Sequence, residues 1–121
     1  MKIESGKWKV MIEEKSFLFA IRVIKLSQYL RERHCENVLI QQLLRSGTSI
    51  GANVSEAEQA QSRADFISKM SIALKETSET KYWIKLVFAT NYLTESEKES
   101  ILSDCVEIEK MLTSIIKTSK E

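Results

Sequence analysis

The sequence predicts an all-α protein that folds as an antiparallel, up-down-up-down four-helix bundle with a short N-terminal arm. Two observations carry this prediction. The chain has no proline and only three glycines in 121 residues, so few turns and long helices are expected. Apolar residues also recur at alternating steps of three and four, which is the spacing of one helix face. We expect an arm over residues 1–12 and helices over residues 13–34, 37–61, 63–91 and 94–119.

The first predicted helix, residues 13–34, has an apolar face that is broader than one stripe. Its apolar residues form a stripe at Phe19, Val23, Leu26 and Leu30 and a wider set at Phe17, Ala20, Ile21 and Ile24. The polar segment from His34 to Asn37 breaks the pattern, and Asn37 is expected to cap the next helix. The arm over residues 1–12 is expected to be irregular or extended.

The second predicted helix contains the stretch RSGTSIGANVSEA, Arg45 to Ala57, with two of the three glycines. A phosphate-binding loop would need G-x-x-x-x-G-K-[ST], or G-x-G-x-x-G after a strand. Here Gly47 and Gly51 are four apart, no lysine follows and no strand precedes. The small residues therefore predict a thin helix, in which two glycines that each cost about 1 kcal/mol allow another backbone to come close.

Asn53 falls on the apolar stripe of this second helix, where an unpaired amide is costly. A contact with a ligand or partner is one interpretation. We favour a hydrogen bond to a neighbouring helix that sets the register of the bundle, as a lone core asparagine does in coiled coils.

The last two predicted helices have the clearest periodicity. Their core stripes are Phe66, Met70, Ala73, Thr77, Thr80, Ile84 and Val87 in the third helix, and Ile101, Cys105, Ile108, Leu112 and Ile115 in the fourth. Ser62 with Asp65 predicts a cap at the start of the third helix, and Thr94 with Glu97 is a capping box that begins the fourth.

No residue pattern predicts an enzyme. The single histidine, His34, stands beside Cys35 in a polar break, without partners at the spacing of a catalytic triad. Glu56, Glu76 and Glu79 offer carboxylates, but a di-metal bundle site needs Glu-x-x-His pairs. We expect these acids to form ion pairs with Lys or Arg of a neighbouring helix or subunit. We expect no catalytic residue, metal, cofactor or small-molecule substrate.

Composition and charge indicate the cellular compartment and the kinds of partner that we expect. No apolar run approaches the roughly 18 residues of a membrane span, the N-terminus lacks a signal-peptide pattern, and the two cysteines are far apart, so we expect a cytoplasmic protein with reduced thiols. The net charge is +1, yet residues 1–45 carry nine Lys or Arg against five Asp or Glu. The basic candidates are Arg22, Lys25, Arg31, Arg33 and Arg45, with a solvated helix face as the alternative.

Nearly the whole chain resembles a known family, and the resemblance is most specific over LLRSGTSIGANVSEAEQAQSRADFISKMSIALKETSETKYWIKL, residues 43–86. It extends to the segments KSFLFAIRVIKL, NYLT and LTSIIKTSK. The family is that of the bacterial four-helix-bundle proteins associated with intervening sequences of 23S rRNA genes, similar in fold to the accessory variability determinant protein of diversity-generating retroelements. The family motif SI-x-x-N-[IV]-x-E and the acidic–aromatic signature of its third helix fall on Ser49, Ile50, Asn53, Val54 and Glu56, and on Glu76, Glu79, Tyr82 and Trp83.

The resemblance implies a pentameric barrel, a nucleic-acid role and no enzymatic activity. One hypothesis is therefore a self-assembling bundle that contacts the phosphates of RNA or DNA through Arg22, Lys25 and Arg45. The other is a structural scaffold or adaptor whose partner is another protein. We expect a homopentamer in both cases, with Tyr82 or Trp83 at the subunit interface, where aromatic residues are enriched.

Overall fold

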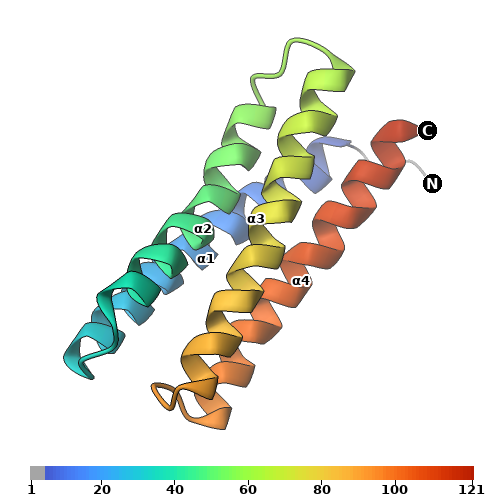
Figure 1. Ribbon diagram of the computed structural model, residues 1–121. Helices are drawn as coiled ribbons and strands as arrows, with labels where there is room; N and C mark the ends of the chain where they lie inside the picture. Colours follow the sequence, from blue (N-terminus) through green and yellow to red (C-terminus); the bar gives the residue numbers. More distant parts are fainter. Residues whose placement is uncertain (1–4) are drawn as a thin grey trace.

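The computed structural model describes residues 5–121 and contains four α-helices joined by short connections (Figure 1). They are α1 (Ser5–Glu32), α2 (Asn37–Ala57), α3 (Arg63–Ala89) and α4 (Glu95–Lys120). Each helix packs against the next, and α1 also contacts α4, which closes the bundle. Residues 5–121 contain no strand, so the predicted all-α four-helix bundle is confirmed.

Contacts between α1 and α2 show that these helices run in opposite directions. Val23 of α1 faces Gly47 of α2, whereas Ser16, two turns earlier in α1, faces Gly51, one turn later in α2. The start of α1 and the C-terminus of α4 lie at the same end of the bundle (Figure 1). The polar connections are short, so each helix packs beside its neighbour in the chain.

The core is built from the predicted stripes. In α4 the stripe from Ile101 to Ile115 is buried throughout, and in α3 only Phe66 is partly exposed. Two hydroxyl residues meet in the centre, where Thr80 donates a hydrogen bond to Ser46 at 3.0 Å and Ser46 donates to the Gln42 carbonyl at 2.9 Å. Each buried hydroxyl therefore has a partner, which removes the cost of burying it.

Helix α1 begins earlier than predicted. The irregular arm expected over residues 1–12 is wrong for residues 5–12, which are helical, and residues 1–4 lie outside the described residues. The physical reason is that the core stripe continues back from Phe19 through Ser16 to Ile12, and both residues are buried. Ser16 interrupts the apolar pattern in the sequence, but its hydroxyl donates to the Glu13 carbonyl at 3.2 Å and so is tolerated inside.

The predicted helix caps are correct in two of three cases. Ser62 accepts a hydrogen bond from the Asp65 N–H, and Thr94 forms a complete capping box with Glu97. The expected Asn37 cap is wrong, because Asn37 is the first residue of α2 and Glu36 precedes it without a side-chain capping bond.

Helices α1 and α3 end earlier than predicted, at Glu32 and Ala89, and each end is followed by a left-handed residue. His34 has φ 60° and Asn91 has φ 73°. In each case the next N–H bonds back to a carbonyl five residues earlier, Cys35 to Leu30 and Tyr92 to Val87. This is the Schellman arrangement, which usually places glycine at the left-handed position. A chain with so few glycines ends its helices with His and Asn instead.

Helix α2 also ends earlier than predicted, at Ala57 instead of residue 61, but it runs without interruption through both of its glycines. A Cβ atom added to Gly47 would lie 2.8 Å from the methyl groups of Val23. One added to Gly51 would lie 3.3 Å from the backbone oxygen of Ser16. The missing side chains therefore allow α1 to approach closely, which offsets the cost of glycine inside a helix. No helix within residues 5–121 is long and apolar enough to cross a membrane.

We expect Gly51→Leu to lower the free energy of unfolding by about 3 kcal/mol, because its side chain must push the α1 backbone outward. Guanidinium denaturation followed by circular dichroism measures the change. Gln41→Leu, on an exposed position of the same helix, is the control and is expected to have little effect. An equal denaturation midpoint for Gly51→Leu and the wild type would contradict the close approach.

Candidate functional site

Helix α1 has a second apolar face, which points away from the bundle. Phe17 leaves 66% of its surface exposed and Leu18 leaves 56%. Within the described chain, exposed large apolar side chains outside α1 are Val38, Ile72 and Tyr82 alone. A contiguous patch of this kind marks an interaction surface more often than scattered single residues do. We call this surface the outer face of α1, formed by Val10, Met11, Phe17, Leu18, Ile21 and Ile24.

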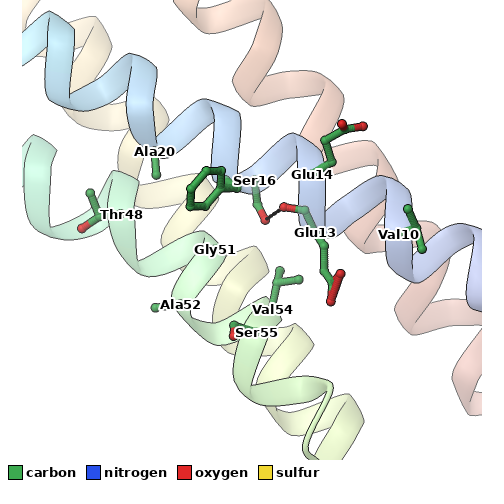
Figure 2. Close-up of a pocket in the computed structure, with 11 residues that line it drawn as sticks. Val10, Glu13, Glu14, Ser16, Ala20, Thr48, Gly51, Ala52, Val54 and Ser55 are labelled. Carbon is green, nitrogen blue, oxygen red and sulfur yellow. Dashed lines mark hydrogen bonds between the residues drawn. The ribbon is translucent and has the colours of Figure 1, made fainter.

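A groove of about 590 Å³ lies beside this face, between α1 and α2 (Figure 2). On the α2 side its wall consists of the small residues Thr48, Gly51, Ala52 and Ser55. On the α1 side it is lined by Val10, Glu13, Glu14, Ser16, Phe17 and Ala20, and Val54 of α2 completes the lining. The groove is open because α2 carries no bulky side chain here.

Two carboxylates border the groove. Figure 2 shows the Glu13 side chain extending towards α2, while the Glu14 side chain points to the other side of α1. Neither forms an ion pair with any residue that the structure describes. The α1/α2 groove therefore combines an apolar lining with unneutralised negative charge, and it suits an apolar group accompanied by a cation.

The three cations predicted to contact phosphates do not form one free basic patch. Arg22 donates to Asp104 at 2.6 Å and to the Ser100 carbonyl at 3.1 Å, so its guanidinium is directed to α4. Arg45 is directed to α3, where it pairs with Glu76 and Glu79. Lys25 is exposed and forms no ion pair within the described part of the chain.

The other two basic candidates lie at the C-terminal end of α1. Arg31 is exposed, and Arg33 packs its guanidinium 5.4 Å from the centre of the Tyr29 ring. The Tyr29 hydroxyl donates to Glu97 at 2.6 Å. This hydrogen bond raises the pKa of Tyr29 and lowers the pKa of Glu97. It ties the end of α1 to the capping box of α4, a link that residue spacing did not indicate.

The predicted acidic residues are all engaged with cations of the neighbouring helix. Glu56 lies 3.2 Å from Lys69, while Glu76 and Glu79 share Arg45. Glu79 also accepts a hydrogen bond from Trp83 Nε1 at 2.9 Å. The Trp83 bond first and then Arg45 lower the pKa of the Glu79 carboxyl group. This network fastens α2 to α3 at the surface of the bundle.

Asn53 does not form the interhelical hydrogen bond that we predicted. Its side-chain amide donates to the Ser49 carbonyl at 2.9 Å, within α2 itself. Val54 is buried in its place, and Asn53 lies partly exposed at the border of the core. The strict steps of three and four follow the core only approximately, because an α-helix has 3.6 residues per turn.

Tyr82 and Trp83 occupy different environments. Tyr82 is 58% exposed, and Trp83 is partly buried. Their ring centres are 4.9 Å apart at an interplanar angle of 75°, an edge-to-face contact. Because Trp83 is anchored by Glu79, the exposed ring of Tyr82 rests against a fixed support.

Neither thiol is arranged as a nucleophile. Burial raises the pKa of the Cys105 thiol to about 12, and burial also raises the pKa of Cys35. A nucleophilic cysteine needs a lowered pKa. Among residues 5–121, no three His, Cys, Asp or Glu side chains gather closely enough to bind a metal ion.

Comparison with known proteins identifies relatives of the chain. A family model described as "23S rRNA-intervening sequence protein" matches residues 9–114. A solved structure from Bacteroides thetaiotaomicron, a protein of unknown function from the S23 ribosomal protein family, is similar over 91% of this chain and 98% of its own. Its sequence is 52% identical and its TM-score is 0.88. No curated protein matches the chain.

We expect Glu79→Gln to reduce the stability that the protein gains between pH 3 and pH 7. Folding lowers the pKa of Glu79, so its ionised carboxylate stabilises the folded protein. This stabilisation is present above the unfolded pKa of about 4.3 and is lost as the pH falls through the folded pKa. The loss in the free energy of unfolding should stay below about 1 kcal/mol, since the ion pair of Glu79 is partly exposed. Urea denaturation at both pH values measures it. Glu32→Gln, at an exposed acid that forms no ion pair within the described residues, is the control, and an equal effect of the two substitutions would contradict the Glu79 network.

Proposed function

This chain belongs to the 23S rRNA-intervening sequence protein family, and we propose that it acts without catalysis, as a helical bundle that assembles with copies of itself. The observation that carries this proposal is the outer face of α1. A single-domain monomer would leave these six apolar side chains in water, although the opposite face of the same helix already supplies the core. A second copy of the chain removes this surface from water.

The pentameric barrel that the sequence resemblance implies is the basis for a ring of five copies. A closed ring repeats every surface feature around its axis, and each copy makes the same contacts. We place the protein in the cytoplasm, since Cys35 and Cys105 are both free, buried thiols and a reducing compartment suits them.

We further propose that the assembled protein contacts nucleic-acid phosphates through cations of α1. Lys25 and Arg31 support this proposal, since both are exposed and neither pairs with an acid within residues 5–121. Each would contribute little alone, but a ring repeats the pair, and multivalency raises avidity by orders of magnitude. A structural scaffold with a protein partner is the alternative, and the same outer surfaces would serve it.

We expect the double substitution Phe17→Glu, Ile21→Glu to abolish assembly while preserving helicity, because both side chains are exposed and lie outside the core. Light scattering should give a multiple of 13.9 kDa for the wild type and 13.9 kDa for the variant. Gln28→Glu, an exposed position of the same helix, is the control and should keep the wild-type mass. A monomeric wild type at micromolar concentration would refute the proposal.

We expect Lys25→Gln with Arg31→Gln to weaken binding to structured RNA and duplex DNA at least tenfold in an anisotropy titration, without a change in mass. Binding by the wild type should fall steeply with salt, because phosphate contacts release counterions. Arg22 is left intact, since its substitution would also break the contact with Asp104. Absent binding at low salt, or equal binding by this variant, would leave the scaffold alternative.

A further inference from the structure

The structure contains a second exposed surface with an aromatic residue at its centre, on α3. Tyr82 and Ile72 are exposed there, and the neighbouring outward positions are polar and carry no acid. These positions follow each other at steps of four and three, which places them on one line along the helix. The line consists of Ser71, Lys75, Ser78, Tyr82 and Lys85.

We propose that the protein assembles head to tail, with the α3 surface around Tyr82 of one copy docked on the outer face of α1 and the α1/α2 groove of the next. This inference rests on the proposed self-association and names the two surfaces that meet. A second copy of the chain occupies the groove. The charges, the shapes and the positions of the two surfaces in the bundle support this contact.

Charge complementarity is the first argument. Lys75 and Lys85 lie on either side of Tyr82 along α3, and neither forms an ion pair with a residue that the structure describes. Glu13 extends into the groove and Glu14 lies beside it on α1, and neither forms an ion pair within residues 5–121. Opposite charges at the border of a contact set its orientation and suppress wrong pairings.

The fit of the two surfaces is the second argument. The groove offers about 590 Å³ beside Phe17, which is room for an aromatic side chain. Tyr82 is a suitable anchor, because its ring is supported edge-on by Trp83 and loses little freedom on binding. Its hydroxyl can meet the small polar residues of the groove wall, Thr48 and Ser55.

The positions of the surfaces exclude a contact within one copy. Helices α1 and α3 lie diagonally across the bundle, because each packs against α2 and α4, although Lys9 near the start of α1 reaches over the Phe66 ring of α3 at 5.6 Å. One copy can therefore engage one neighbour through α1 and another through α3. A contact between different surfaces extends or closes into a ring, whereas a two-fold contact uses the same surface twice.

A two-fold contact between two α1 helices is the competing arrangement. It would cover the outer face of α1 and could bring Lys25 of one copy towards Glu14 of the other. It would leave Tyr82 and Ile72 in water, together with the unpaired Lys75 and Lys85. The head-to-tail contact covers both apolar surfaces at once and neutralises both sets of charges.

Complementation between two variants tests the proposal. Phe17→Glu disables the groove side, and Tyr82→Glu disables the α3 side. By sedimentation velocity, at a concentration where the wild type is fully assembled, each variant alone should be a 13.9 kDa monomer. An equimolar mixture should contain a 1:1 dimer of twice that mass, because one intact groove and one intact Tyr82 remain. Tyr82→Phe is the control and should keep the wild-type mass.

The outcomes separate this inference from the proposed function. A monomeric wild type would overturn self-association itself. An assembled wild type with a Tyr82→Glu variant of unchanged mass, or a mixture without the 1:1 dimer, would overturn the head-to-tail contact and leave self-association standing. Circular dichroism confirms that each variant is folded.

Charge reversal gives a second test that does not depend on the aromatic substitutions. Glu14→Lys and Lys75→Glu should each reduce the assembled fraction at least tenfold near the dissociation midpoint, because like charges then face each other. The double variant Glu14→Lys, Lys75→Glu should recover assembly. Equal fractions in all three variants would overturn the assignment of these charges to one contact.

Discussion

The close approach of α1 and α2 at Gly47 and Gly51 is the constraint on which the rest of the structure depends. Without side chains at these positions, Val23 and the backbone of Ser16 lie directly against α2. The same lack of bulk leaves a groove next to Phe17, since Ala52 and the glycine offer nothing to fill it. The small residues of α2 therefore have two effects. They allow tight packing against the core side of α1, and they leave an open groove beside its outer face.

Polar groups divide between those that bind the helices together and those that remain available. Arg45 is committed to the carboxylates of α3, and Arg22 to Asp104 of α4. These pairs lie at the surface, where each adds little stability but disfavours other alignments of the helices. The cations left over, such as Lys25 and Lys75, are the ones that a partner can use.

Assembly and partner binding are linked in the arrangement that we propose. The exposed apolar residues of α1 drive association, and the charges beside them select which surface meets which. In the non-catalytic role that we propose, the surfaces of the bundle carry the function rather than its interior. A repeated surface turns weak individual contacts into useful affinity, so the oligomer would be the active unit.

The sequence by itself determined the four helices, two of the three predicted helix caps and most of the core. These follow from local rules, since the spacing of apolar residues and the caps at Ser62 and Thr94 depend on neighbours within a turn or two. The tertiary structure alone decided which of the two apolar faces of α1 turns inward, and that residues 5–12 continue this helix. It also decided that Val54 enters the core in place of Asn53, and that Arg22 and Arg45 are directed to neighbouring helices. Each of these outcomes depends on the distance and rotation between packed helices, and no spacing within a single helix contains that information.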